Sequence, residues 1–246
     1  MNTASKIVSF RNPQAAARVG RHDWKALARE LDDFGCAVIE KLLTPEECSA
    51  IAALYPQEHF RSHVVMARHG FGKGEYRYFA YPLPDLVEAL RTALYARLAP
   101  VANAWNERMG DKTRYPVDHE AYLRACHEAG QKRPTPLLLQ YGPGDFNALH
   151  QDLYGDLAFP IQAAVLLSEP GRDFAGGEFV LTEQRPRMQS RAEVVPLRQG
   201  DAVAFAVHNR PVQGTKGSYR VNMRHGVSRI RSGRRHTLGI IFHDAR

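Results

Sequence analysis

Residues 137–155 read LLLQYGPGDFNALHQDLYG, and they open the part of the chain that decides the fold. An apolar run ends in a Gly/Pro-rich turn, and the pair His150 and Asp152 follows that turn. Residues i and i+2 of a strand point to the same side, so both side chains could reach one metal ion. Because His-x-Asp pairs also occur by chance, the pair taken alone favours an ordinary polar turn.

Short runs of β type continue from this stretch to the end of the chain, and turn residues separate them. They read PLLLQY, FPIQAAVLLSE, GEFVLTEQ, EVVPL, DAVAFAV, YRVNMRHGV and RRHTLGIIF. Such even spacing favours a β-sandwich or a barrel. Since helical patterns come first and strands afterwards, we expect an α+β fold. It would be a double-stranded β-helix (jelly roll) with N-terminal helices packed on one sheet.

Helical periodicity dominates the part of the chain before these runs. Trp24, Leu27 and Leu31 recur at helical spacing and predict a first helix. Residues 84–130 are again amphipathic, and Pro100 is expected to end one helix within them, because proline lacks the N–H that a helix interior needs.

The length of 246 residues suits one domain with one core. We expect a single domain over residues 23–246, made of a helical cover and substrate lid (23–134) and a jelly-roll core (135–246). Residues 1–22 are expected to be a mobile leader.

Composition restricts the class of protein. Hydrophobic residues make up 44% and charged residues 24% of the chain, as in globular proteins. The sequence contains no apolar run of about 18 residues, so it predicts no membrane helix. The N-terminal residues lack the apolar core of a secretory signal. Three widely spaced cysteines indicate a reducing compartment, so we expect a cytoplasmic protein. The net charge of +7 weakly favours polyanionic partners.

The late β region offers a distal partner for the His-x-Asp pair. Two imidazoles and one carboxylate form the facial triad of non-haem Fe(II) sites, which leaves positions open for cosubstrate and oxygen. His225 would supply the second imidazole, and His243 is the less favoured alternative. Arg235 follows ten residues after His225. A turn at RSG and a returning strand would bring it back towards the site, with Thr237 on the same face. Arginine there suits a bidentate ion pair with a carboxylate.

Together these residues resemble the Fe(II)/2-oxoglutarate-dependent dioxygenases. The spacing Tyr141-x2-Gly144-x5-His150-x-Asp152 is similar to the prolyl-hydroxylase-like branch, although that branch often has lysine where Arg235 stands. The chain resembles still more closely a bacterial oxygenase family described as acting on damaged, alkylated nucleic acid. That resemblance rests on the strings GQKRPTPLLLQY, LHQDLYG, GGEFVLTEQRPRMQSR and RHGVSRIRSGRRHTLGIIFHDA.

The resemblance implies a mechanism and a set of site residues. His150, Asp152 and His225 would hold Fe(II), and Arg235 would pair with the C5 carboxylate of 2-oxoglutarate. Tyr141 and Thr237 would support the cosubstrate by hydrogen bonds, and O2 would be consumed. The expected reaction hydroxylates a C–H bond and demethylates alkylated DNA bases, releasing formaldehyde, succinate and CO2. One alternative is a prolyl-hydroxylase-like oxygenase acting on a protein side chain or small molecule. Another is a non-catalytic binding module.

Residues 61–82 are interrupted by glycines and read as a strand pair or a long loop. Within them, residues 61–78 mix basic and aromatic side chains, which suits phosphate contacts and base stacking. We expect them to form a lid that receives alkylated DNA or RNA and that could accept a flipped base. A solvated loop whose aromatic rings cover the barrel is the alternative. The candidate substrate residues are Arg68, Phe71, Lys73, Tyr76, Arg77 and Tyr78. A basic turn with Arg185, Arg187 and Arg191 could extend the phosphate track. The sequence says nothing of the oligomeric state.

Overall fold

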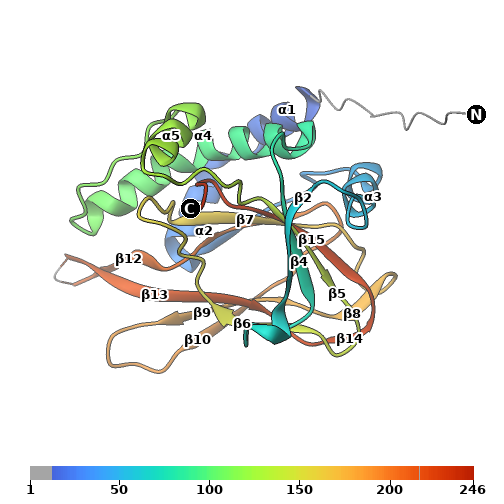
Figure 1. Cartoon of the computed structure of the whole chain (residues 1–246). Helices are drawn as coiled ribbons and strands as arrows, with labels where there is room; N and C mark the ends of the chain where they lie inside the picture. The colour runs from blue at the N-terminus through green and yellow to red at the C-terminus, as the bar shows by residue number, and fades with distance from the viewer. Residues whose placement is uncertain (1–12, 216) are drawn as a thin grey trace, which may run out of the picture.

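The computed structural model describes residues 13–215 and 217–246, and it contains two facing antiparallel sheets beneath a layer of helices (Figure 1). The large sheet has seven strands in the order β1-β11-β7-β15-β5-β4-β2. The smaller sheet has the order β10-β9-β13-β6-β3, with β12 paired to β13, and β14 pairs with β8 in a separate ribbon. The expected arrangement of two sheets with helices on one of them is therefore present.

The helices are α1 (Pro13–Arg21), α2 (Trp24–Phe34), α3 (Pro45–Ala52), the 3-10 turn η1 (Met66–Arg68), α4 (Asp85–Arg108) and α5 (His119–Glu128). The first eight strands are β1 (Cys36–Ile39), β2 (Phe60–Val65), β3 (Gly72–Lys73), β4 (Glu75–Phe79), β5 (Leu137–Tyr141), β6 (Phe146–His150), β7 (Ile161–Leu166) and β8 (Phe174–Gly176). The others are β9 (Phe179–Gln184), β10 (Arg191–Val195), β11 (Ala202–Ala206), β12 (Asn209–Gly214), β13 (Gly217–Val227), β14 (Ile230–Gly233) and β15 (Arg235–Ile240).

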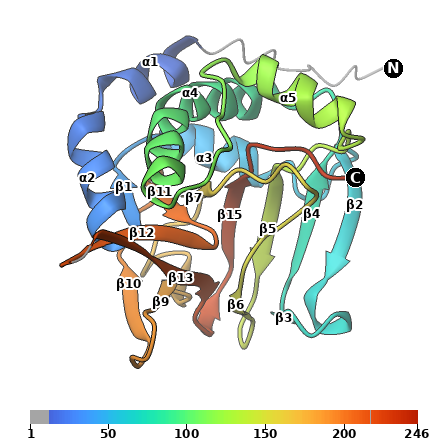
Figure 2. The ribbon, with the colours of Figure 1, turned by 90° about the vertical axis from the view of Figure 1, so that its left-hand side faces the viewer.

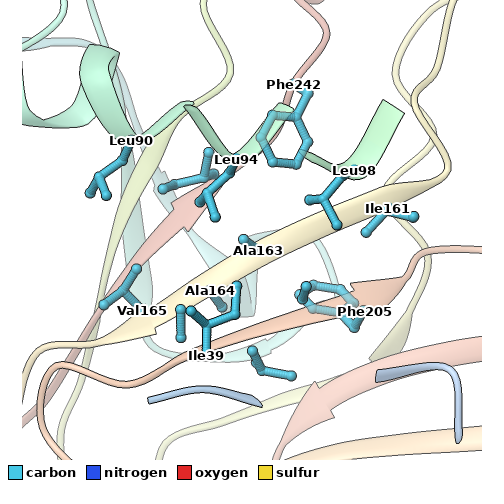
Figure 3. Packing of buried hydrophobic residues seen from close by; sticks show 14 of the residues in the cluster. Ile39, Leu90, Leu94, Leu98, Ile161, Ala163, Ala164, Val165, Phe205 and Phe242 are labelled. Carbon is cyan, nitrogen blue, oxygen red and sulfur yellow. The ribbon is translucent and has the colours of Figure 1, made fainter. Parts of the chain in front are cut away.

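The large sheet is covered on both faces. Leu90, Leu94 and Leu98 recur at helical spacing on α4 and pack against the outer face of the sheet (Figure 3). Strand β7 is accordingly buried at every position. Its residues alternate, so that Val165 packs in the main core while Gln162 lines the cavity between the sheets.

Two expectations about the helices were wrong. Residues 13–21 of the expected leader form α1, whose Ala15 and Val19 are buried in the main core because the helix packs on α4. Residues 1–12 of that leader lie outside the described residues. Helix α4 also continues through Pro100, which is exposed, while Leu98 and Ala102 on either side of it are buried. Packing of the buried face therefore offsets the hydrogen bond that the proline removes.

The division at residue 135 was too simple as well, because β1, β2 and β4 belong to the same large sheet as the later strands. The segment that the sequence left as a strand pair or a long loop is the hairpin of β2 and β4, with β3 joining the smaller sheet.

The two connections that shape the site both cross between sheets. Strand β5 lies in the large sheet, and after a turn the chain returns as β6 in the smaller sheet (Figure 2). In that turn Gly144 has a φ of 86° and the Asp145 carboxylate accepts a hydrogen bond from the Gly142 amide. The chain likewise leaves the smaller sheet after β13, passes through β14 and enters the large sheet as β15. Both crossings place residues that are close in sequence on opposite walls of one cavity.

Candidate active site

The structure brings together the three expected metal ligands. His150 on β6 and His225 on β13 are register partners, and their ring centroids are 4.2 Å apart. Asp152 follows directly after β6. Its Oδ1 lies 3.4 Å from Nε2 of His150, and its Oδ2 lies 3.3 Å from Nε2 of His225. One ligand atom from each residue falls within 4.8 Å of the others, so the three could hold one ion.

The electrostatics of Asp152 and His225 match this role. Burial acts to raise the pKa of Asp152, but hydrogen bonds from His150 and His225 and their charges outweigh it and hold the pKa well below its usual range. Asp152 is therefore ionised at neutral pH. Burial also lowers the pKa of His225, although the nearby Asp152 acts to raise it. The imidazole of His225 is therefore neutral at neutral pH. A neutral imidazole beside a carboxylate is the state in which these groups bind a metal.

Neighbouring groups orient two of the three ligands. Nδ1 of His150 lies 2.8 Å from the Ala148 carbonyl oxygen, which leaves Nε2 free to act as the donor atom. The hydroxyl of Tyr154 donates a hydrogen bond of 2.8 Å to Oδ1 of Asp152. This donor set of two imidazoles and one carboxylate fits Fe(II).

Arg235 and Tyr141 lie together at one end of the cavity, and their chemistry suits an anion-binding end. Both are fully buried and are register partners on β15 and β5. The Arg235 guanidinium donates to the Thr237 hydroxyl, but its Nε has no hydrogen-bond partner and no carboxylate of the described residues pairs with it. Burial lowers the pKa of Arg235 to about 10, so it stays charged at neutral pH. A buried charge without a counter-ion is costly unless a ligand pairs with it. A dicarboxylate cosubstrate would supply that counter-ion.

The Tyr141 hydroxyl points to the same conclusion. It makes no hydrogen bond of standard geometry within the described residues, although the Asn147 amide lies near enough to influence its pKa. Unpaired buried donors are rare in folded proteins, and they are explained where a ligand completes them.

The triad and Arg235 open on one cavity of about 220 Å³ between the two sheets. Amide side chains of Asn147, Gln151 and Gln162 contribute to its wall, and the rest is mainly apolar. Its aromatic lining consists of Phe71, Tyr76, Tyr78, Tyr141, Tyr154, Phe179 and Phe205.

The predicted lid residues are separated by the structure. Phe71, Tyr76 and Tyr78 line the cavity. Arg77 lies between the two tyrosines on β4 and faces the opposite side, where its guanidinium stacks 4.9 Å from the centre of the Tyr55 ring. The expectation that Arg77 belongs to the substrate group is therefore wrong, because strand alternation turns it away from the cavity.

The remaining basic candidates do not line the cavity. Arg68 and Lys73 are exposed beside it. Arg185 forms an ion pair with the buried Glu183, at 2.6 Å, and is not a free phosphate ligand. Arg187 and Arg191 are exposed.

The sequence did not single out Tyr154, Gln162, Phe179 or Phe205. Tyr154 follows Asp152 by two residues, so the same alternation that linked His150 and Asp152 could have indicated it. The others lie on strands recognised only by their apolar character, which does not show which face meets the site.

Comparison with known proteins identifies the family. Residues 74–245 match the model of the family Oxygenase-NA, described as "Oxygenase, catalysing oxidative methylation of damaged DNA". The chain belongs to this family. Two uncharacterized proteins from two strains of Mycobacterium tuberculosis are each 48% identical to it over 167 residues, which is 68% of this chain and 72% of theirs.

Solved structures with the same fold include oxygenases. A prolyl-4-hydroxylase of Pseudomonas putida superimposes with a TM-score of 0.52 at 16% identity, over 91% of this chain and 99% of that one. An oxidoreductase of the 2OG-Fe(II) oxygenase family from Burkholderia pseudomallei gives 0.54 at 15% identity, over 92% and 94%. A Trichoplax adhaerens prolyl hydroxylase in complex with a hypoxia inducible factor peptide fragment gives 0.58 at 13%, over 89% and 87%. These likenesses confirm the jelly-roll fold.

The family description makes the chain an oxygenase, which confirms the expected oxidoreductase class. The triad fits the expected Fe(II), and the buried, unpaired Arg235 fits a carboxylate of the expected 2-oxoglutarate. No helix in the described residues combines the length and apolar character needed to cross a membrane.

Proposed function

We propose that this enzyme demethylates alkylated nucleobases in DNA by oxidising the N-methyl group. The family description speaks of damaged DNA and of oxidative methylation. Oxygenases of this class insert oxygen into a C–H bond, which leads to loss of a methyl group and not to its addition. The methyl carbon is oxidised to hydroxymethyl while 2-oxoglutarate is oxidised to succinate and CO2, one O2 being consumed. The hemiaminal then breaks its C–N bond to release formaldehyde and the repaired base.

Each residue has a separate task in this proposal. His150, Asp152 and His225 hold Fe(II), which supplies the oxidising chemistry when bound. Arg235 pairs with the C5 carboxylate of 2-oxoglutarate, and Tyr141 and Thr237 complete its hydrogen bonds. The fixed position of Arg235 turns the cosubstrate towards the triad, and the apolar walls exclude water from the reacting groups.

The observation that carries the choice of substrate, beside the family description, is the aromatic lining next to the triad. Tyr76 and Tyr78 meet edge to face with centroids 5.4 Å apart, and Tyr78 meets Tyr154 at 6.5 Å. Aromatic walls of this kind suit a flat base, which enzymes of base chemistry take out of the stack and enclose between rings. Exposed Phe71 and His69 stack at 5.3 Å beside the cavity, with Arg68 and Lys73 near them in the chain. We infer that they contact the neighbouring nucleotides.

Two measurements test the proposal. Fe(II)-dependent formation of succinate from 2-oxoglutarate should be abolished by Asp152→Ala. Formaldehyde should be released from N-methylated single-stranded oligonucleotides, and a proline-containing peptide, whose hydroxylation would yield hydroxyproline and no formaldehyde, should not stimulate succinate formation. Turnover of the peptide without turnover of any methylated oligonucleotide would support a protein substrate instead. Localisation in the cytoplasm stays a prediction.

A further inference from the structure

Gln162 carries a buried amide that the chemistry described so far does not use. Its side chain is only 3% exposed and lines the cavity. Its Nε2 has no hydrogen-bond partner within the described residues. Leaving a buried amide donor unpaired costs roughly 1–3 kcal/mol, so an unpaired donor that faces a cavity indicates a ligand that pairs with it.

The strand register places Gln162 at the reactive end of the cavity. Gln162 on β7 is the register partner of Phe205 on β11. The Phe205 ring in turn lies 4.6 Å from the His225 ring, centre to centre. Phe205 is on the side of the sheet away from the α4 leucines (Figure 3), and it lines the cavity together with the triad. The unpaired amide therefore lines the same cavity as the triad, one side chain, Phe205, away from His225.

The same register separates Gln162 from the anion-binding end. Ile240 pairs with Ala163, so Gln162 lies opposite Ile241, which is six residues from Arg235. At about 3.3 Å per residue, the backbone positions of Gln162 and Arg235 are roughly 20 Å apart along the sheet. The terminal carbons of 2-oxoglutarate are only about 5 Å apart for C–C bonds of about 1.5 Å. A cosubstrate paired with Arg235 would therefore fill only part of this span, and the KM of a Gln162 variant for 2-oxoglutarate separates a cosubstrate contact from a substrate contact.

We propose that Gln162 forms a substrate subsite that reads the hydrogen-bonding edge of the alkylated base. Its Nε2 donates to a ring nitrogen or carbonyl oxygen of the base while the aromatic walls hold the faces. This inference rests on the proposed function. An amide is suited to the task because glutamine offers a donor and an acceptor in one plane, which matches the edges of nucleobases. An apolar wall would hold any flat group, whereas this donor prefers bases with an acceptor at that edge.

The test compares Gln162→Met with Gln140→Met. Methionine keeps approximately the volume of glutamine but has no amide donor. Gln140 lies on β5 in the same sheet, but its side chain faces away from the cavity and bonds Glu75 and His236, so it is a matched control. We expect Gln162→Met to weaken binding of a methylated single-stranded oligonucleotide by metal-free protein about 2- to 10-fold, as for one lost hydrogen bond. The kcat/KM for formaldehyde release should fall by a similar factor. The KM for 2-oxoglutarate in turnover without oligonucleotide should not change.

Each other outcome overturns the subsite. If Gln162→Met binds and turns over the methylated oligonucleotide like the wild type, Gln162 does not read the base. If instead the KM for 2-oxoglutarate rises, Gln162 binds the cosubstrate. If the wild type releases no formaldehyde from any methylated oligonucleotide while still forming succinate, the proposed function fails and the base assignment fails with it. Thermal unfolding checks the fold, and the isosteric Gln162→Glu, which replaces the donor with an acceptor, serves if the methionine variant is unstable.

Discussion

Replacing Arg235 with methionine should raise the free energy of unfolding of the metal-free protein and strongly lower its affinity for 2-oxoglutarate. Burial lowers the pKa of this guanidinium from 12.5 to about 10, which corresponds to a cost of about 3 kcal/mol for its charged form. Methionine removes that cost and fills part of the space, but it loses the hydrogen bond to Thr237, worth about 1 kcal/mol. We therefore expect a net gain of about 2 kcal/mol in the free energy of unfolding, or roughly 4–8 °C in Tm.

Arg91→Met is the contrasting variant. Arg91 is equally buried, but it is paired with Asp244 at 2.8 Å, and both side chains are completely buried. Removing one partner of such a pair costs about 3–5 kcal/mol, so this variant should be destabilised. Chemical unfolding of both variants, with 2-oxoglutarate titrated into each, separates the cases. Arg235→Met should lose at least about 30-fold in 2-oxoglutarate affinity, because truncating one partner of a buried charge pair costs about 2–5 kcal/mol. If Arg235→Met is destabilised like Arg91→Met and still binds 2-oxoglutarate normally, the reasoning is refuted.

Three further predictions follow from individual contacts. Tyr154→Phe keeps the ring but removes the hydrogen bond to Asp152, so Fe(II) affinity measured by titration should fall about 10- to 100-fold, and an unchanged affinity would contradict this role. Gly74→Ala should raise the KM for 2-oxoglutarate, because a Cβ there would lie 2.7 Å from Cδ1 of Tyr141 and displace that ring. Gly70→Ala, also at positive φ but in open space, should leave the KM unchanged. Equal effects of the two variants would show that contact with Tyr141 is not the cause. Burial, assisted by the charge of Arg91, lowers the pKa of His119 and of His243 from 6.5 to about 4. The unfolded chain therefore takes up protons before the folded one. These two residues should make the metal-free protein less stable by about 2–3 kcal/mol at pH 5.5 than at pH 7.5. Urea unfolding at both pH values measures this difference. If His119→Asn leaves the difference unchanged, the prediction is wrong.

That His150, Asp152, His225 and Arg235 line one cavity could be predicted from the sequence, because the proposed chemistry needs fixed residue types at compatible spacings. The alternation of side chains along a strand is enough to predict that His150 and Asp152 point the same way. The ten residues from His225 to Arg235 are enough for the end of one strand, a turn and the start of a returning strand. The sequence could not show that both turns cross between sheets, which is why these residues face one another across a cavity.

The substrate residues were harder to predict. The sequence did not decide whether segment 61–78 forms a strand pair or a loop. A loop gives no rule for the direction in which the Arg77 side chain points. Once β4 is a strand, Tyr76 and Tyr78 must share one side and Arg77 the other. Gln162 lies in a run whose other residues are almost all apolar. Only the order of the strands in the sheet shows that its amide faces the cavity and not the helices.

The most direct test of the account measures succinate and formaldehyde together, using an N-methylated single-stranded oligonucleotide, Fe(II), 2-oxoglutarate and O2. The account expects one formaldehyde for each methyl group removed, with at least as much succinate, and neither product from Asp152→Ala. Succinate without formaldehyde from every methylated oligonucleotide would contradict the demethylation. The absence of both products from the wild type loaded with Fe(II) would contradict the role given to His150, Asp152 and His225.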